Sequence, residues 1–251
     1  MDIIKKLIKN RTLYGMLIVI MFWYILHISV DSNMIPSPYE TVKVLFELMK
    51  KDLIKHLAFS TYRVTVALLI SLLIGVPLGL WTGANRKLDE IISPVAYILY
   101  PLPKIAFLPI FMILFGLGDI AKIILITTIV VFQIQLAARD GVKEIPKELH
   151  YSMRTLGLSS RQIFIELIFP AALPKLMSTL RTSIGISISA LFLSENFATS
   201  YGIGYFIMNS WIMVDYKSMF AGILALSILG LFLFKIVDVL EKKLCPWLFI
   251  K

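Results

Sequence analysis

Long apolar runs separated by short polar segments dominate the pattern of hydrophobic and polar positions along this chain. A helix needs about 20 largely apolar residues to cross the hydrocarbon core of a bilayer. Six stretches reach or approach that length: 13–30, 64–83, 91–118, 120–138, 182–193 and 218–234. The short alternating segments typical of membrane β-barrels are not visible. The pattern therefore predicts an all-α integral membrane protein with about six transmembrane helices.

The third run, 91–118, contains Pro101, Pro103 and Pro109. Each proline removes a backbone donor, so a continuous helix is not expected there. Breaks at membrane depth are tolerated where protein or a water-filled cavity surrounds them. The run is therefore either a simple kink or a broken helix near a translocation path, and the chain crosses the membrane five or six times.

Composition supports the membrane class. Hydrophobic residues make up 58% of the 251, charged residues 16%, and the mean hydropathy is +0.84. A soluble domain of this length could not bury that much apolar surface. The net charge of +9 is explained by basic loops that orient the chain, so no nucleic-acid partner is expected. Cys245 is the single cysteine, which excludes an internal disulfide.

Basic residues orient the predicted helices, because loops rich in lysine and arginine stay in the cytoplasm. They occur at Lys5, Lys6, Lys9 and Arg11, at Arg86 and Lys87, in segment 139–161, and at Lys242 and Lys243. This predicts a multi-pass protein of the cell membrane with both termini in the cytoplasm. The start resembles a signal peptide, but no A-x-A site follows the long first run, which indicates an uncleaved helix.

Segment 31–60 lies outside in this topology, although it also contains lysines. Its Ser37-Pro38-x-Glu40 start predicts a helix with a capping box and proline at the first position. Apolar residues then recur at helical spacing from Val42 to Leu57. This amphipathic helix either lies on the membrane surface or simply packs on the protein.

No catalytic or metal-binding set is visible, and no cofactor is expected. Gly116-Leu117-Gly118-Asp119 matches the G-x-G-D of intramembrane aspartyl proteases, but that chemistry needs a second facing aspartate. Asp119 is instead expected to cap the helix that begins at Ile120. The three histidines are dispersed, and no G-x-x-x-x-G-K-[ST] exists, so the chain has no P-loop for ATP.

Charged residues inside membrane helices are functional candidates. Lys122, Lys175, Arg181 and Lys235 lie near predicted helix ends, where snorkelling would accommodate them. Glu195, at the outer end of the fifth run, either lines the mouth of a path or caps local backbone. Lys104 lies beside the predicted break. Lys104 and Glu195 are therefore the candidates for a translocation path.

Residues 146–170 form a polar, proline-bounded interruption past the midpoint of the chain. Pro146 can start a helix that Gly157 ends as a C-terminal cap. Ser159-x-x-Gln162 is a capping box for a second helix, which Pro170 ends or kinks. Leu149, Met153 and Leu156 share one face of the first helix. The segment is either a passive interfacial helix or an amphipathic helix offered to a groove on another protein.

Aligned on Gly157, this segment resembles the cytoplasmic loop of ABC-importer permeases, E-A-A-x3-G-x9-I-x-L-P. The chain supplies Tyr151-Ser152-Met153, then Gly157, then Leu167-x-Phe169-Pro170, while the E-A-A triplet itself is absent. Four further stretches resemble the nitrate, sulfonate, taurine and bicarbonate importers and relatives that carry pyrimidine or flavin vitamin precursors. They are PSPYETV, GVPLGLWTG, YPLPKIAFLPIFMILFGLGDIAKI and SYGIGYFI, and the likeness covers about residues 36–243.

The resemblance implies one permease domain over 1–251 in the small type I importer fold, with a core at about 60–243 and a coupling loop at about 139–174. It implies a non-catalytic subunit with four kinds of partner: two copies of a cytoplasmic ATP-binding subunit, a second permease copy, an extracytoplasmic solute-binding protein and the lipid membrane. The implied solute is a small anion or a vitamin precursor. The implied coupling residues are Arg154, Thr155, Leu156, Gly157, Leu158 and Ser159.

Two other classes fit less well. A self-sufficient secondary transporter predicts inverted repeats and charged pairs deep in the helices, and the sequence shows no clear repeat and few deep charges. A membrane-embedded enzyme needs a convergent catalytic set, and none is visible.

Overall fold

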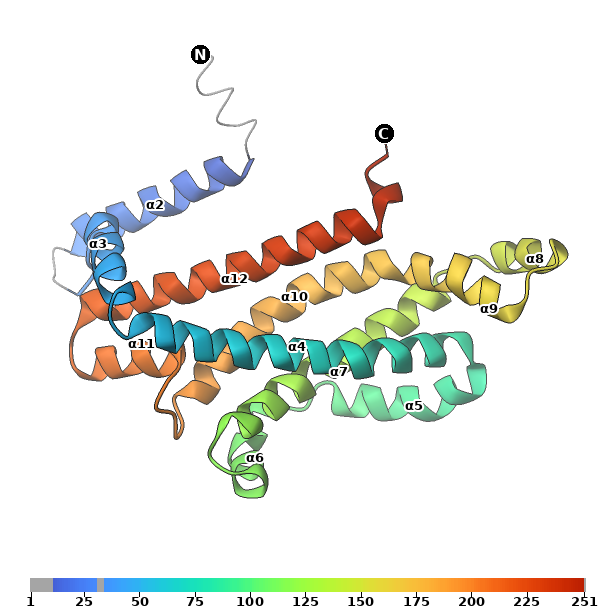
Figure 1. The fold of residues 1–251 in the computed structure, drawn as a ribbon, viewed down its shortest axis with the longest axis horizontal. Helices are drawn as coiled ribbons and strands as arrows, with labels where there is room; N and C mark the ends of the chain where they lie inside the picture. The colour runs from blue at the N-terminus through green and yellow to red at the C-terminus, as the bar shows by residue number, and fades with distance from the viewer. Residues whose placement is uncertain (1–10, 31–33, 251) are drawn as a thin grey trace, which may run out of the picture.

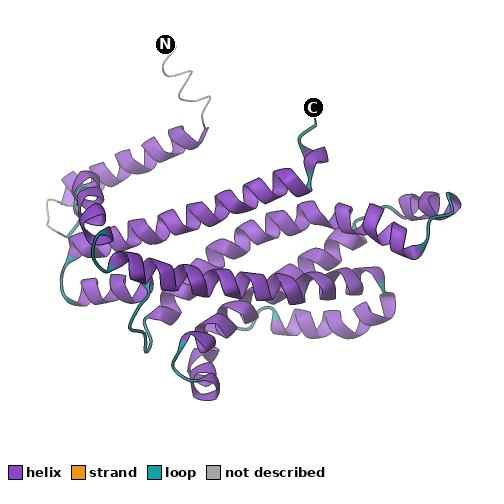
Figure 2. Cartoon of the chain, viewed as in Figure 1, coloured by secondary structure: helices purple, strands orange, loops and turns teal. Residues whose placement is uncertain are grey.

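A computed structural model of the chain describes residues 11–30 and 34–250. Helices account for most of these residues and no strand occurs among them (Figures 1 and 2). The longer elements are α2 (Arg11–Val30), α3 (Pro38–Met49), α4 (Leu53–Ala84), α5 (Arg86–Leu99), α6 (Leu108–Phe115), α7 (Asp119–Lys143), α8 (Lys147–Thr155), α10 (Phe169–Glu195), α11 (Ile203–Ile212) and α12 (Tyr216–Leu244). The short elements are η1 (Lys104–Phe107), α9 (Ser160–Ile163), the π-helical turn η2 (Phe164–Ile168) and η3 (Pro246–Leu248).

The apolar runs of the sequence correspond to helices that could cross a membrane. Within the described residues, four helices are long and apolar enough: α4, α7, the continuous Ser160–Glu195 and α12. A shorter apolar helix covers Tyr14–Val30. The remaining run is the pair Arg86–Leu99 and Lys104–Phe115, which bends by 82°. The predicted all-α membrane fold is confirmed.

Run 91–118 was expected to form either a simple kink or a broken helix. The bend is a sharp turn, so the helix is broken and not simply kinked. The carbonyls at the end of a helix have no partner within it and need another donor. Lys104 supplies one, since its Nζ donates to the carbonyls of Leu99 (2.9 Å) and Tyr100 (2.8 Å). The sequence-predicted site residue Lys104 thus caps the carboxyl end of α5.

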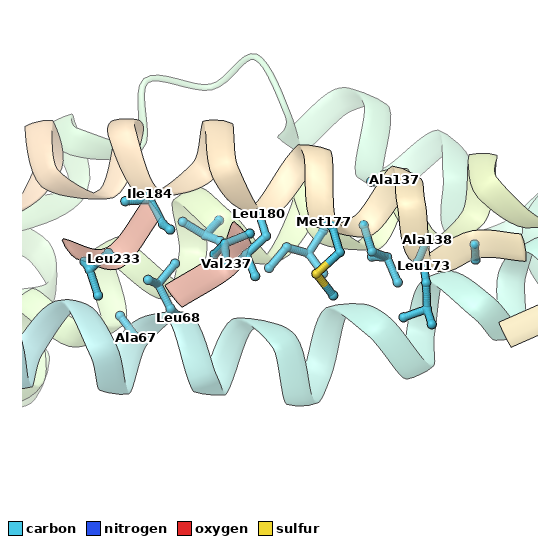
Figure 3. Packing of buried hydrophobic residues seen from close by; sticks show 14 of the residues in the cluster. Ala67, Leu68, Ala137, Ala138, Leu173, Met177, Leu180, Ile184, Leu233 and Val237 are labelled. Carbon is cyan, nitrogen blue, oxygen red and sulfur yellow. The ribbon is translucent and has the colours of Figure 1, made fainter. Parts of the chain in front are cut away.

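The molecule has two ends, here called the α8 end and the α3 end. The α8 end carries the α4–α5 turn, α8 and α9, at the right of Figure 1, and the α3 end carries α3 and α11, at the left. The main buried cluster lies between them, where side chains of α4, α7, α10 and α12 point toward one another (Figure 3). Examples are Ala67, Leu180, Ile184 and Leu233. Lipid is as apolar as these side chains, so close packing holds such helices together.

Glycines of α4 allow its close contact with α7. Gly75, Gly79 and Gly83 recur every four residues and face α7. A Cβ on Gly79 would lie 2.3 Å from the carbonyl oxygen of Gln135, which is too close for any side chain. Small residues at this spacing are how membrane helices bring their backbones together.

Gly79→Ala is therefore expected to lower the stability of the protein by about 1–3 kcal/mol, the usual cost of overpacking. Gly15→Ala in α2 is the matched control, because no atom lies within 4 Å of its added Cβ. Alanine favours a helix over glycine by about 0.5–1 kcal/mol, so the control should be neutral or stabilising. Thermal unfolding in detergent measures both, and equal midpoints for the two variants would contradict the packing argument.

At the α3 end, α3 packs on α12 and α4 and buries Thr41 and Leu45. The predicted cap by Ser37 and the proline at the first helical position are confirmed, since Ser37 Oγ accepts from the Glu40 N–H and the helix begins at Pro38. The Glu40 carboxylate pairs with Lys217 (3.2 Å), which lowers the pKa of Glu40. The structure thus shows the packing role of α3.

Candidate functional site

The first candidate site is the turn between α8 and α9, residues 147–163, here called the elbow. Helix α8 has Pro146 at its N-cap and ends in a Schellman motif. The Leu158 N–H donates to the Met153 carbonyl (3.2 Å), and the Gly157 N–H donates to the Arg154 carbonyl (2.9 Å). Gly157 has φ +81°, a left-handed conformation that glycine adopts without strain. The predicted helix and its glycine cap are confirmed.

A reciprocal cap starts the second arm of the elbow. Ser159 Oγ accepts from the Gln162 N–H (3.4 Å), and Gln162 Oε1 accepts from the Ser159 N–H (2.8 Å). The predicted capping box is therefore confirmed. Pro170 does not end the helix, because the chain continues through the π-helical turn η2 into α10. Two capped helix ends separated by four residues, 156–159, make the tip of the elbow a rigid turn.

The apolar residues predicted to share one face of α8 differ in their exposure. Met153 and Leu158 are half-buried against the main cluster, and they anchor the elbow. Leu156 instead projects outward and is 75% exposed. The structure therefore brings the predicted residues Arg154–Ser159 together at the tip, with Leu158 turned inward and the other five exposed. An exposed leucine on a rigid turn is suited to enter a groove of another protein.

Glu195 lies in a second place, toward the α3 end, where it is fully buried. Its carboxylate accepts from Arg63 Nη1 (2.6 Å), from Ser60 Oγ (2.8 Å) and from the Gly204 N–H (2.8 Å). A buried carboxylate needs a cation and donors on its remaining lone pairs, and this one has both. One of these contacts caps backbone at the start of α11, and the other two join Glu195 to α4.

Arg63 connects Glu195 to α7. Only 3% of its side chain is exposed, and its Nε and Nη2 donate to Asp119 Oδ1 at 2.8 and 2.6 Å. Asp119 makes no cap bond at the start of α7, so the predicted cap is wrong and the carboxylate serves the arginine instead. Arg63, Asp119 and Glu195, with Lys122 described next, form what we call the buried ion cluster.

Lys122 was expected to snorkel, and that prediction is wrong. Its side chain is 1% exposed. Its Nζ donates to the carbonyls of Leu117 (3.3 Å) and Gly118 (3.4 Å) and, across the loop after α10, of Ala198 (3.3 Å). That loop covers the start of α7, so the lysine cannot reach the surface.

Ser60 and His56 extend the cluster to the start of α11. The Ile203 N–H donates to Ser60 Oγ (2.8 Å), and His56 Nδ1 lies 3.0 Å from both backbone polar atoms of Gly202. A Cβ on Gly202 would lie 2.5 Å from Glu195 Cδ, so only glycine fits beside this carboxylate. Polar contacts thus join α4, α7, α10 and α11.

An open cavity of about 410 Å³ lies between α5, α7 and α10. Tyr97 of α5, Tyr100 directly after this helix and Gln133 of α7 line it, together with Thr179 and Thr182 of α10. Asp140 and Lys175, near the α8 end, also line it. None of these residues is recognisable as a site from the sequence, because they come from three helices and carry no motif.

The comparison with known families decides the class. The model of one family, binding-protein-dependent transport system inner membrane component, matches residues 75–245. The chain belongs to this family. The match contains α7, the elbow, α10 and α12, and it identifies the chain as the permease subunit of an ABC importer, a family of transport proteins and not of enzymes.

Curated relatives of the permease agree with the resemblance found in the sequence. It is 29% identical to the taurine transport system permease protein TauC of Escherichia coli over 85% of this chain and 80% of that protein. It is 29% identical to the putative aliphatic sulfonates transport permease protein SsuC of Bacillus subtilis over 87% of this chain and 79% of that protein. It is 26% identical to the nitrate import permease protein NrtB of Synechocystis over 96% of this chain and 90% of that protein.

Among solved structures, the permease is similar to a chain of the MetNI methionine ABC transporter in an inward-facing conformation. The TM-score is 0.64 at 20% identity, and the likeness covers 79% of this chain and 98% of that chain. It shows that the permease has the type I importer fold.

Proposed function

We propose that this permease forms the solute path of an ABC importer and couples it to a separate cytoplasmic ATPase through the tip of the elbow. The observation that carries the proposal is Leu156, which is 75% exposed on a turn fixed by two helix caps. Exposure of an apolar side chain to water is unfavourable in free energy, and burial of Leu156 in a groove of a partner would remove this unfavourable term.

The charge distribution supports a cytoplasmic elbow. Basic residues gather at the α8 end, and lysine and arginine favour the cytoplasmic side. They include Arg86, Lys87, Lys147, Arg154 and Arg161. Helix α12 runs from the α3 end toward the same side (Figure 1), which supports a cytoplasmic position for Lys242 and Lys243. The basic residues Lys5, Lys6 and Lys9 lie outside the described residues.

The proposed assembly contains two copies of the ATPase, a second copy of the permease and an extracytoplasmic solute-binding protein. One chain type suffices, because a two-fold pair needs only one self-complementary surface. Closure of the two ATPases would push the two elbows together, and the helices would switch between inward-open and outward-open states as rigid bodies. The whole chain, 1–251, acts as one permease domain with its core at about 60–243 and the coupling loop at about 139–174.

The proposed solute is a small anion such as a sulfonate, taurine, nitrate or bicarbonate. The names of the relatives TauC, SsuC and NrtB support it. A second candidate is a vitamin precursor, because the permease is also 27% identical to the formylaminopyrimidine transport permease protein ThiX of Halalkalibacterium halodurans, over 85% of this chain and 86% of that protein.

Purification of the tagged permease from its native membrane in a mild detergent tests the proposal. We expect a stoichiometric soluble protein with a P-loop to accompany it, because the permease itself contains no P-loop. A chain that purifies alone and transports alone in liposomes would instead be a secondary transporter.

A further inference from the structure

We infer that the cavity between α5, α7 and α10 holds the solute of the permease and that it is built for a small oxyanion. The inference rests on the proposed function and adds the residues of the site. At about 410 Å³ the cavity lies within the range of small-molecule sites, roughly 300–1,000 Å³.

The lining offers uncharged hydrogen-bond donors. Tyr97 and Tyr100 contribute phenols, and Thr179 contributes a hydroxyl. The Gln133 Oε1 accepts from Ser183 Oγ (2.8 Å), so the amide NH₂ is the group that Gln133 keeps for other partners. Neutral donors bind an anion without the strong attraction of an ion pair, and a solute that must leave again needs such moderate binding.

The charged groups at the α8 end of the cavity are already paired. Lys175 makes an ion pair with Glu144, and Asp140 makes one with Arg139 (2.8 Å). Neither Lys175 nor Asp140 is therefore a free charge for the solute. Because the charges in these pairs compensate each other, the sign of the electrostatic potential inside the cavity is set by a residue farther from the α8 end.

That residue is Lys104, behind Tyr100. Its Nζ lies 5.7 Å from the ring centroid of Tyr100 and 5.3 Å from that of Phe132. In the part of the chain that the structure describes, no carboxylate lies within ion-pair distance of this ammonium, whose bonded partners are two carbonyls. An ammonium group with no carboxylate partner attracts anions to its neighbourhood.

The open side of the cavity continues along α10. Ser178, Thr182, Gly185 and Ser189 are exposed at helical spacing and form one stripe. Polar residues of a membrane-spanning helix face water or protein and avoid lipid. The stripe therefore indicates that the open side of the cavity faces water or another protein surface and not the bilayer.

Cysteine labelling tests the inference without any transport measurement. In a Cys245→Ser background, Thr182→Cys is treated in inside-out vesicles with methanethiosulfonate ethylsulfonate, an anionic sulfonate, and with its cationic trimethylammonium counterpart. We expect the ratio of the anionic to the cationic labelling rate to be about tenfold higher at Thr182→Cys than at the exposed Ser152→Cys. A nearby uncompensated cation produces this difference because it attracts the anionic reagent. Millimolar taurine or nitrate should slow the anionic reaction.

Lys104→Met should remove the anion preference, and Lys104→Arg should retain it. Ser227→Cys, on the exposed face of α12, is the control for a cysteine outside the cavity. The inference is overturned if Thr182→Cys reacts no faster than Ser227→Cys, or if its reagent ratio equals that of Ser152→Cys. Either result leaves the co-purification of the ATPase unaffected, so failure of the site and failure of the proposed function are distinguishable.

Discussion

Leu156→Asp is expected to abolish solute uptake while the transmembrane helices stay folded. The change places a charge on Leu156 at the elbow tip, which is 75% exposed, where the partner groove would have to desolvate it. Apolar anchors of interfaces contribute about 2–4 kcal/mol, which corresponds to a loss of affinity of roughly 30- to 1,000-fold. ATP-driven uptake by the reconstituted importer measures the effect.

Leu248→Asp is the matched control, because Leu248 is also an exposed leucine on a short helical turn, at the end of the chain. It should transport normally. Gly157→Pro should fail as Leu156→Asp does, since proline cannot adopt φ +81° and lacks the N–H that bonds Arg154. Normal uptake in either elbow variant would refute the coupling role.

Arg63→Ala is expected to destabilise the permease by about 3–5 kcal/mol, because it leaves a buried charge without its partner. Glu195, fully buried, would lose its cation, and Asp119 would lose two hydrogen bonds. Arg181→Ala is the control, since this arginine also joins two carboxylates, Asp238 and Glu241. Its side chain is 36% exposed, so a loss of only about 0–1 kcal/mol is expected.

Thermal unfolding in detergent compares the two alanine variants. Arg63→Met combined with Glu195→Leu should regain part of the stability lost in Arg63→Ala, because the double change removes the unpaired buried charge. If Arg63→Ala and Arg181→Ala shift the midpoint equally, the buried ion cluster does not stabilise the fold as its contacts indicate.

Local signals explain what the sequence predicted well. The apolar runs specified the helices through a single property, their length in apolar residues. The elbow depended on bonds that span three to five residues, from Gly157 to Arg154 and from Ser159 to Gln162. Such bonds are readable from residue type and spacing alone.

Contacts between distant segments explain what the sequence did not predict. Arg63 lies 132 residues from Glu195 and 56 from Asp119, and nothing in either neighbourhood indicates the pairing. Lys122 was misplaced for the same reason, because the loop that buries it comes from the end of α10. The cavity likewise exists only after three helices have packed.

The break after α5 lies between these cases. The prolines indicated that the helix is interrupted, since each removes a donor. They could not give the 82° bend or the capping of Leu99 and Tyr100 by Lys104, because both depend on how α6 returns against α7.

The most direct test of the account is chemical cross-linking from the elbow tip in the native membrane. A Leu156→Cys permease in the Cys245→Ser background is treated with a short bifunctional thiol and amine reagent, and the products are identified by mass spectrometry. We predict one main product that joins the permease to a P-loop ATPase, and no such product from Leu248→Cys. A functional Leu156→Cys permease that links to no ATPase would contradict the coupling of this permease through its elbow.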